Sequence, residues 1–153
     1  MKIIGNPITV GTILIHAVFS TKNQQPLITA EIEPFLYDKI SKILFDDCYS
    51  PALVIGGDVE HLHILYVNAR DRSIDFIINR VKEKSSQFIR KLSPRFEWQE
   101  SYAAVTVSRS CDEIEKDYIA RQKEIHKTLN YKAEFRKFLE DNGIEYDEDG
   151  LWE

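Results

Sequence analysis

Hydrophobic residues follow two different periods along the chain, and the order of these periods predicts the fold. Apolar and β-branched runs predict four strands, which cover residues 12–19, 52–56, 61–67 and 102–107. Apolar residues three and four positions apart predict two helices, with stripes from Ile32 to Leu44 and from Ile74 to Leu92. Thr29 stands before the first helix as its expected cap, and the second helix is expected to begin near Ser73. The elements therefore follow the order βαββαβ.

Two more helices are expected after the last strand. Ser110 and Glu113 have the S-x-x-E spacing of a capping box, which predicts that a third helix begins there. A last helix around Phe135 is expected to stop at Asn142 and Gly143. With right-handed crossovers, the βαββαβ order gives an α+β, ferredoxin-like fold, in which a four-stranded antiparallel sheet carries two helices on one face. We expect the third helix to cover the other face.

The composition is that of one ordinary domain, because 43% of the 153 residues are apolar and 29% are charged. The two cysteines lack the spacing of a metal site, and the longest apolar stretches are too short to span a membrane. No secretion signal is recognisable, so we expect a cytoplasmic protein. Residues 140–153 hold seven acids and no Lys or Arg, and without them the net charge changes from −5 to +2. We therefore expect one domain at residues 1–139 and an acidic tail at residues 140–153.

Basic residues gather within the second predicted helix and just after it. The segment 80–95 has six basic residues against a single acid. Two interpretations remain open, because such a segment is either a solvated helix face or a strip that faces the phosphates of a nucleic acid. The second interpretation predicts DNA contacts for Arg80, Lys82, Lys84, Arg90 and Lys91.

His61 and His63 are the first residues that indicate chemistry. Side chains two positions apart on a strand point to the same face, so both imidazoles project together while Leu62 and Ile64 face the helical core. Two convergent imidazoles can bind one metal ion. The alternative is an exposed histidine pair without such a role, and a third ligand is needed to decide between the two.

The third helix offers such a ligand together with a nucleophile. Tyr118 and Gln122 are four residues apart, and with Ile114 and Ile125 they form a stripe that would pack on the open face of the sheet. An ion held by the two histidines and the Gln122 carbonyl oxygen would polarise a phosphodiester for in-line displacement. A tyrosine hydroxyl has a pKa of about 10, so it needs a cation or a base nearby to attack at neutral pH. The alternative is a core tyrosine beside a surface amide.

Together these motifs resemble one family. A His-hydrophobic-His strand followed by a helix with Tyr-x-x-x-Gln is similar to the single-tyrosine transposases of the HUH endonuclease superfamily, the small insertion-sequence enzymes that move single-stranded DNA. The similarity extends from about Ile13 to Phe138, and its motifs beyond the histidine pair lie at residues 16–22, 98–102, 105–108 and 118–126. The combination is more specific than any one of its parts.

The resemblance implies an enzyme with a defined mechanism. Tyr118 would attack a DNA phosphate, become joined to the 5′ phosphate and release a 3′ hydroxyl. One phosphoester replaces another in this exchange, so strand joining needs no nucleoside triphosphate. The family further implies a homodimer, recognition of subterminal DNA hairpins, and Mg²⁺ or Mn²⁺ as the metal. The chemistry of the ligands favours Mn²⁺ or Zn²⁺, because Mg²⁺ prefers oxygen and water over imidazole.

Three further residues are interpreted through the same resemblance. Glu60 precedes the histidine pair where relatives often have aspartate, and a carboxylate at this position would orient one imidazole. His126 stands where many relatives have paired histidines, and a contact with DNA or metal competes there with a plain surface position. His16 would share the sheet face of the histidine pair if the first and third strands are neighbours.

The leading hypothesis is a transposase, that is, a metal-dependent single-strand DNA endonuclease and strand transferase. A second hypothesis is a catalytically silent module that binds nucleic acid through the sheet and the basic segment. Relaxases and replication initiators of the same superfamily are the closest enzymatic competitors, although they tend to be larger. A phosphoesterase with two histidines as acid and base ranks last, because the chain lacks a second histidine motif of similar spacing.

Overall fold

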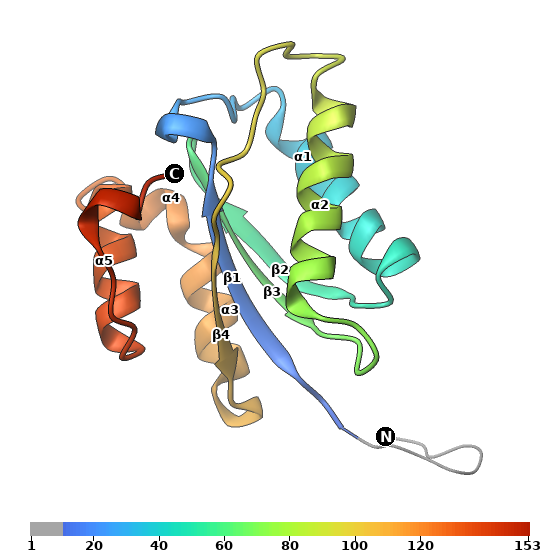
Figure 1. Ribbon diagram of the computed structural model, residues 1–153, viewed down its shortest axis with the longest axis vertical. Helices are drawn as coiled ribbons and strands as arrows, with labels where there is room; N and C mark the ends of the chain where they lie inside the picture. The colour runs from blue at the N-terminus through green and yellow to red at the C-terminus, as the bar shows by residue number, and fades with distance from the viewer. Residues whose placement is uncertain (1–10) are drawn as a thin grey trace.

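Strands and helices follow one another in the predicted order. The computed structural model describes residues 11–153, and Figure 1 shows a sheet that lies between two helical layers. The strands are β1 (Leu14–Ser20), β2 (Ala52–Gly57), β3 (His61–Val67) and β4 (Ala103–Val107). The helices are α1 (Glu33–Lys42), α2 (Ile74–Ile89), α3 (Asp112–Ala120), α4 (Gln122–Ile125) and α5 (Tyr131–Asp141). Short turns are the π-helical η2 (Ile43–Asp47) and the 3-10 segments η1 (Lys22–Gln24), η3 (Arg109–Cys111) and η4 (Glu148–Gly150).

The sheet has the order β2-β3-β1-β4 with antiparallel neighbours, which confirms the ferredoxin-like α+β prediction. The central strands β1 and β3 pair so that His16 lies opposite Leu65 and Val18 opposite His63. Directly opposed residues of an antiparallel pair project from the same face. His16 therefore shares the face of the histidine pair, as the sequence predicted for neighbouring first and third strands.

The main hydrophobic core lies between the sheet and the helices α1 and α2. Phe19, Leu62 and Tyr66 point into it from β1 and β3, and each is completely buried. Ser73 caps α2, because its side chain accepts a hydrogen bond from the backbone N–H of Phe76. The polar residues His16, Ser20, His61 and His63 of these two strands project from the other face.

The other face is covered by α3, α4 and α5 (Figure 1). Ile119 of α3 is fully buried and packs with Leu14 and Leu65. α5 contributes a second cluster, in which Phe135 packs with Val18. The prediction that a helical segment covers this face is confirmed. Within residues 11–153, none of the helices combines the length and the apolar character that a bilayer crossing requires.

Two details of the third helix were predicted wrongly. Ile114 is 71% exposed, because the helix turns the side of Glu115 and Ile119 toward the sheet. The capping box is absent, since the η3 turn intervenes and α3 begins only at Asp112, while the Ser110 hydroxyl pairs with that of Ser108. The helix is also interrupted after Ala120, which separates α3 from α4.

The last helix ends where the sequence predicted. Gly143 has a φ of +67°, and its N–H closes the final turn of α5. The residues after it fold back along the molecule. The Trp152 ring lies 5.7 Å from that of Phe135, and the Glu153 carbonyl accepts a hydrogen bond from the Ser101 N–H. The C-terminal segment thus connects α5 to the segment before β4.

Candidate active site

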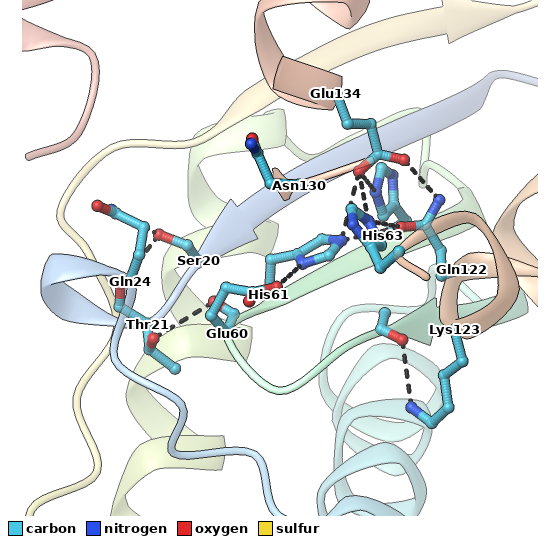
Figure 2. A network of polar contacts seen from close by, with 12 residues as sticks. Ser20, Thr21, Gln24, Glu60, His61, His63, Gln122, Lys123, Asn130 and Glu134 are labelled. Carbon is cyan, nitrogen blue, oxygen red and sulfur yellow. Dashed lines mark hydrogen bonds and ion pairs between the residues drawn. The ribbon is translucent and has the colours of Figure 1, made fainter. Parts of the chain in front are cut away.

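The two histidines of β3 are buried beneath the helices α4 and α5, and Figure 2 shows their rings among the polar groups of that side. The Nδ1 atom of His61 lies 2.6 Å from a carboxylate oxygen of Glu60. Its Nε2 atom lies 2.9 Å from the carbonyl oxygen of Gln122. Glu60 is therefore placed where it can orient this imidazole, with the Nε2 atom directed into the cluster.

His63 is held in the same way by a longer chain of contacts. Its Nδ1 atom lies 2.8 Å from His16 Nε2, and His16 Nδ1 lies 2.8 Å from a carboxylate oxygen of Glu115. One set of tautomers satisfies both contacts: His63 Nδ1–H donates to His16, and His16 Nδ1–H donates to Glu115. In this arrangement the Nε2 lone pair of His63 is free and faces the cluster.

Glu134 of α5 is the centre of the cluster. Its oxygen Oε1 lies 3.2 Å from His63 Nε2 and 3.5 Å from His61 Nε2. Its oxygen Oε2 accepts hydrogen bonds from the Tyr118 hydroxyl and, at 2.8 Å, from the Gln122 amide nitrogen. The Glu134 side chain is only 3% exposed. One buried carboxylate therefore contacts both the histidine pair and the tyrosine.

Tyr118 and Gln122 meet the histidines within a single chain. The Tyr118 ring centroid lies 5.7 Å from that of His63. Although the helix is interrupted at Arg121, with φ −97° and ψ 19°, both side chains reach the same oxygen of Glu134. Residues that are distant along the sequence are thus assembled without a second subunit.

His126 also joins this cluster. Its Nε2 atom lies 2.9 Å from the Gln122 carbonyl oxygen and 3.0 Å from Glu134 Oε1, while Nδ1 lies 2.7 Å from the carbonyl oxygen of Leu129. The side chain is only 3% exposed. The interpretation of His126 as a plain surface residue is therefore wrong, because the turn after α4 directs the ring inward, whereas its contact with DNA or metal stays a prediction.

Burial and hydrogen bonding separate the pKa values of these groups. Burial lowers the pKa of His63 to about 3, which keeps this imidazole neutral. Burial also disfavours the charged form of His61, but hydrogen bonds to Glu134, Glu60 and Gln122 outweigh it and raise the pKa to about 9. Burial together with the Glu134 carboxylate raises the pKa of Tyr118 above its usual value, so its hydroxyl is protonated.

The Glu134 carboxylate is the negative charge that balances this group. Burial alone would raise its pKa, but hydrogen bonds with His126 and His61, together with the nearby His63 ring, outweigh burial and hold the pKa well below its usual value. Glu134 is therefore ionised at neutral pH. Its charge, together with the neutral His63, makes this side of the cluster attractive to a cation.

The donor atoms have the spacing that a metal ion requires. Ligating atoms of His61, His63 and Glu134 all lie within 4.8 Å of one another. Contacts among these residues and Gln122 are 2.9–3.5 Å long. Ligands about 2.1 Å from an ion are about 3.0–3.4 Å from their neighbours. Imidazole nitrogens combined with amide and carboxylate oxygens suit a first-row divalent ion, so the residues fit the metal that the sequence predicted.

A cleft leads along the tyrosine side of this cluster. It has a volume of about 520 Å³ and lies between β4, α3 and α5. His16, Tyr118 and Glu134 line it, together with Phe138 and Lys137. The nucleophile candidate and its carboxylate partner therefore face a space that an extended substrate can enter.

The basic segment lies elsewhere. α2 packs on the opposite face of the sheet from the histidine cluster (Figure 1), so its basic residues do not converge with Tyr118. Lys82 is buried and donates to the carbonyl oxygens of Gln99, Glu100 and Ser101, so its prediction as a DNA contact is wrong. Arg80 and Lys84 pair with Asp47, and Arg90 donates to the carbonyl of Phe96, whereas Lys91 is exposed.

Sequence reasoning missed Glu134. The signal that could have found it is its place on α5, where it lies on the apolar face formed by Tyr131, Phe135 and Phe138. A carboxylate on a buried face requires a partner.

Comparisons with known proteins concern the family and the fold. A sequence model of the family described as "Transposase IS200 like" matches residues 9–122. A crystal structure of a protein from Deinococcus radiodurans R1, assigned as a transposase, is 19% identical, with a TM-score of 0.63 over 80% of this chain and 98% of that chain. A REP-associated tyrosine transposase bound to a REP hairpin is 18% identical, with a TM-score of 0.59 over 84% of this chain and 76% of that chain. No curated protein sequence matches significantly.

Proposed function

The chain belongs to the IS200-like transposase family, and on this premise we propose that it cuts and rejoins single-stranded DNA with Tyr118 as the nucleophile. The observation that carries the proposal is the meeting of the Tyr118 hydroxyl with the His61 and His63 cluster at one carboxylate. A tyrosine with a merely structural role has no need of a neighbouring group of potential metal ligands.

The first chemical step exchanges one phosphoester for another. The Tyr118 oxygen forms a bond to phosphorus, the bond from phosphorus to the 3′ oxygen breaks, and the 3′ oxygen takes up a proton from solvent. The Glu134 carboxylate, which accepts the Tyr118 hydrogen bond, orients the hydroxyl, and the phenol proton leaves to solvent. The product is a 5′-phosphotyrosine linkage and a free 3′ hydroxyl. Attack of another 3′ hydroxyl on this linkage joins strands and regenerates the tyrosine.

His61, His63 and the Gln122 carbonyl oxygen would hold the metal. When bound, Mg²⁺ or Mn²⁺ supplies positive charge that polarises the phosphodiester and favours ionisation of the phenol. The chain's own contribution is orientation. Glu60 fixes His61, and His16 fixes His63, so that each Nε2 lone pair is directed to the same point.

The proposed substrate is a single strand that carries a hairpin. A REP hairpin is what the similar REP-associated tyrosine transposase binds. The cleft beside Tyr118 offers a wall from Phe138, on which a base can stack, and a cation from Lys137, which pairs with Asp141 in the absence of DNA. The proposal also includes a homodimer, as the family resemblance implies. Light scattering of the purified protein tests this oligomeric state, and a monomer would contradict it.

A denaturing gel tests the proposal directly. Hairpin-bearing single strands labelled at the 3′ end are incubated with protein and Mn²⁺, so that the downstream fragment remains visible when it is attached to the protein. We expect a covalent adduct with the native chain and none with Tyr118→Phe, while hairpin binding by Tyr118→Phe persists. Tyr146→Phe is the matched control, because this tyrosine is remote from the histidines and contacts Glu140.

Two outcomes would contradict the proposal. An adduct that persists in Tyr118→Phe would assign the nucleophile to another residue. Hairpin binding by the native chain without any adduct would favour the catalytically silent binding module.

A further inference from the structure

We propose that Glu134 is a further ligand of the metal ion and that its second oxygen positions Tyr118, so that one carboxylate joins the metal site to the nucleophile. This inference rests on the proposed function. It adds a residue from α5, which lies beyond the part of the chain that the family model matches, residues 9–122.

The two oxygens of Glu134 face different groups. Oε1 is directed to the imidazoles, at 3.2 Å from His63 Nε2 and 3.5 Å from His61 Nε2. Oε2 accepts the hydrogen bonds of the Tyr118 hydroxyl and the Gln122 amide nitrogen. A bridging carboxylate uses its oxygens in this way, with one on a cation and the other on hydrogen-bond donors.

A purely structural acid does not account for this placement. In the tautomers described above, His63 Nε2 presents a lone pair, and the atom opposite it at 3.2 Å is Glu134 Oε1, which is also an acceptor. Electron pairs that converge on one small region repel each other unless a positive charge lies among them. A divalent ion at this point satisfies all of these atoms at once.

The backbone around Glu134 is fixed before any ion binds. Asn130 caps α5 by accepting a hydrogen bond of 2.8 Å from the Ala133 N–H. The Tyr131 ring stacks on that of His61, with 4.3 Å between centroids and 21° between planes. Phe135 packs on the sheet side and against Trp152. Packing on both sides therefore presents the carboxylate to the histidines with little freedom to withdraw.

A carboxylate in the ligand set changes the chemistry of the site. Two imidazoles with one carboxylate favour Mn²⁺, Fe²⁺ or Zn²⁺ over Mg²⁺. The negative charge of Glu134 would also repel a DNA phosphate until an ion balances it. Because Glu134 also accepts the hydrogen bond of the Tyr118 hydroxyl, the position of the nucleophile depends on a residue that ligates the ion.

Titration calorimetry with Mn²⁺ alone, without DNA, tests this assignment. We expect Glu134→Gln to raise the dissociation constant of Mn²⁺ by about 10–100-fold, as loss of a group that supports a metal typically does. Glu140→Gln is the matched control, because Glu140 lies on the exposed side of the same helix and should leave the constant unchanged.

A second variant covers the case in which Glu134→Gln does not fold. Glu134→Asp keeps the charge but withdraws the oxygens by one methylene, so Mn²⁺ should again bind more weakly than to the native chain. Affinity equal to or higher than that of the native chain, in a folded Gln or Asp variant, would overturn the inference. The double variant His61→Ala, His63→Ala separates the two proposals. If the double variant also binds Mn²⁺ with native affinity, the metal site itself is wrong. If the double variant loses Mn²⁺ binding while the Glu134 variants bind normally, only the role of Glu134 is refuted.

Discussion

His16 Nε2 lies 2.8 Å from His63 Nδ1, and this contact joins two neighbouring strands of the sheet. It continues through His16 Nδ1 to Glu115 on α3, at 2.8 Å. The position of α3, which carries Tyr118, is therefore connected to the orientation of a proposed metal ligand. The same three residues fix the tautomer that leaves His63 Nε2 available.

Glu115→Ala is expected to weaken Mn²⁺ binding about tenfold, although Glu115 itself does not reach the ion. Without Glu115, His16 Nδ1–H has no acceptor that fixes the tautomer of the ring. His16 Nε2 is then no longer held as the acceptor for His63 Nδ1–H, so the orientation of His63 is lost. Calorimetry measures the change. Glu113→Ala on the exposed side of the same helix serves as the control. Equal affinities of the two variants would refute the proposed chain of contacts.

Metal affinity is expected to rise with pH. The pKa of His61 is raised to about 9 in the metal-free protein, and an imidazole must lose its Nε2 proton before it can ligate. Below that pKa, each unit of pH therefore strengthens apparent binding about tenfold, and the gain levels off above it. Titrations between about pH 6.5 and 8.5, in two buffers of different ionisation enthalpy, should also detect about one released proton per ion. An affinity that is constant over this range would contradict the protonated His61.

Lys82→Met is expected to destabilise the fold rather than to weaken DNA binding specifically. The Lys82 ammonium donates to three carbonyl oxygens of the segment before β4, and its removal leaves them without this donor. The expected loss of unfolding free energy is about 2–3 kcal/mol. Lys91→Met, at an exposed position, should change it by less than about 0.5 kcal/mol. Urea denaturation at neutral pH compares the two, and equal stabilities would contradict the structural role.

The sequence was sufficient to predict the sheet and the part of the candidate site that the strands carry. The two-residue period of β3 places His61 and His63 on one face, and the βαββαβ order makes β1 and β3 neighbours, which brings His16 beside them. These predictions succeeded because they depend on local periodicity and on topology. Neither depends on how distant side chains pack.

The errors occurred where packing between distant segments decides. Glu134 reaches the histidines because α5 folds back over the sheet after the turn at residues 126–130, and no local pattern encodes that return. Lys82 appeared to belong to a basic surface strip, but its burial depends on carbonyl groups of the segment 99–101. The interruption at Arg121 escaped detection because its neighbours have ordinary helical preferences.

The approach of α3 to β2 provides a test of how strictly Tyr118 must be placed. A Cβ atom added to Gly56 would overlap the carbonyl oxygen of Ile119, which belongs to the backbone next to Tyr118. Gly56→Ala must therefore push α3 away from the sheet, and the tyrosine moves with it.

We expect Gly56→Ala to slow formation of the covalent DNA adduct about 100-fold, because a displacement of about 1 Å at a reacting group has effects of this size. Mn²⁺ affinity should fall less, by about tenfold as in Glu115→Ala, because β3 holds His61 and His63 while the contact of Glu115 with His16 shifts with α3. Gly150→Ala, where an added Cβ meets no neighbour within 4 Å, is the control. The measurement is the single-turnover rate of adduct formation on a denaturing gel. A normal rate in Gly56→Ala would mean that the tyrosine acts from a position other than the one it occupies against β2, as it would if α3 served a partner subunit.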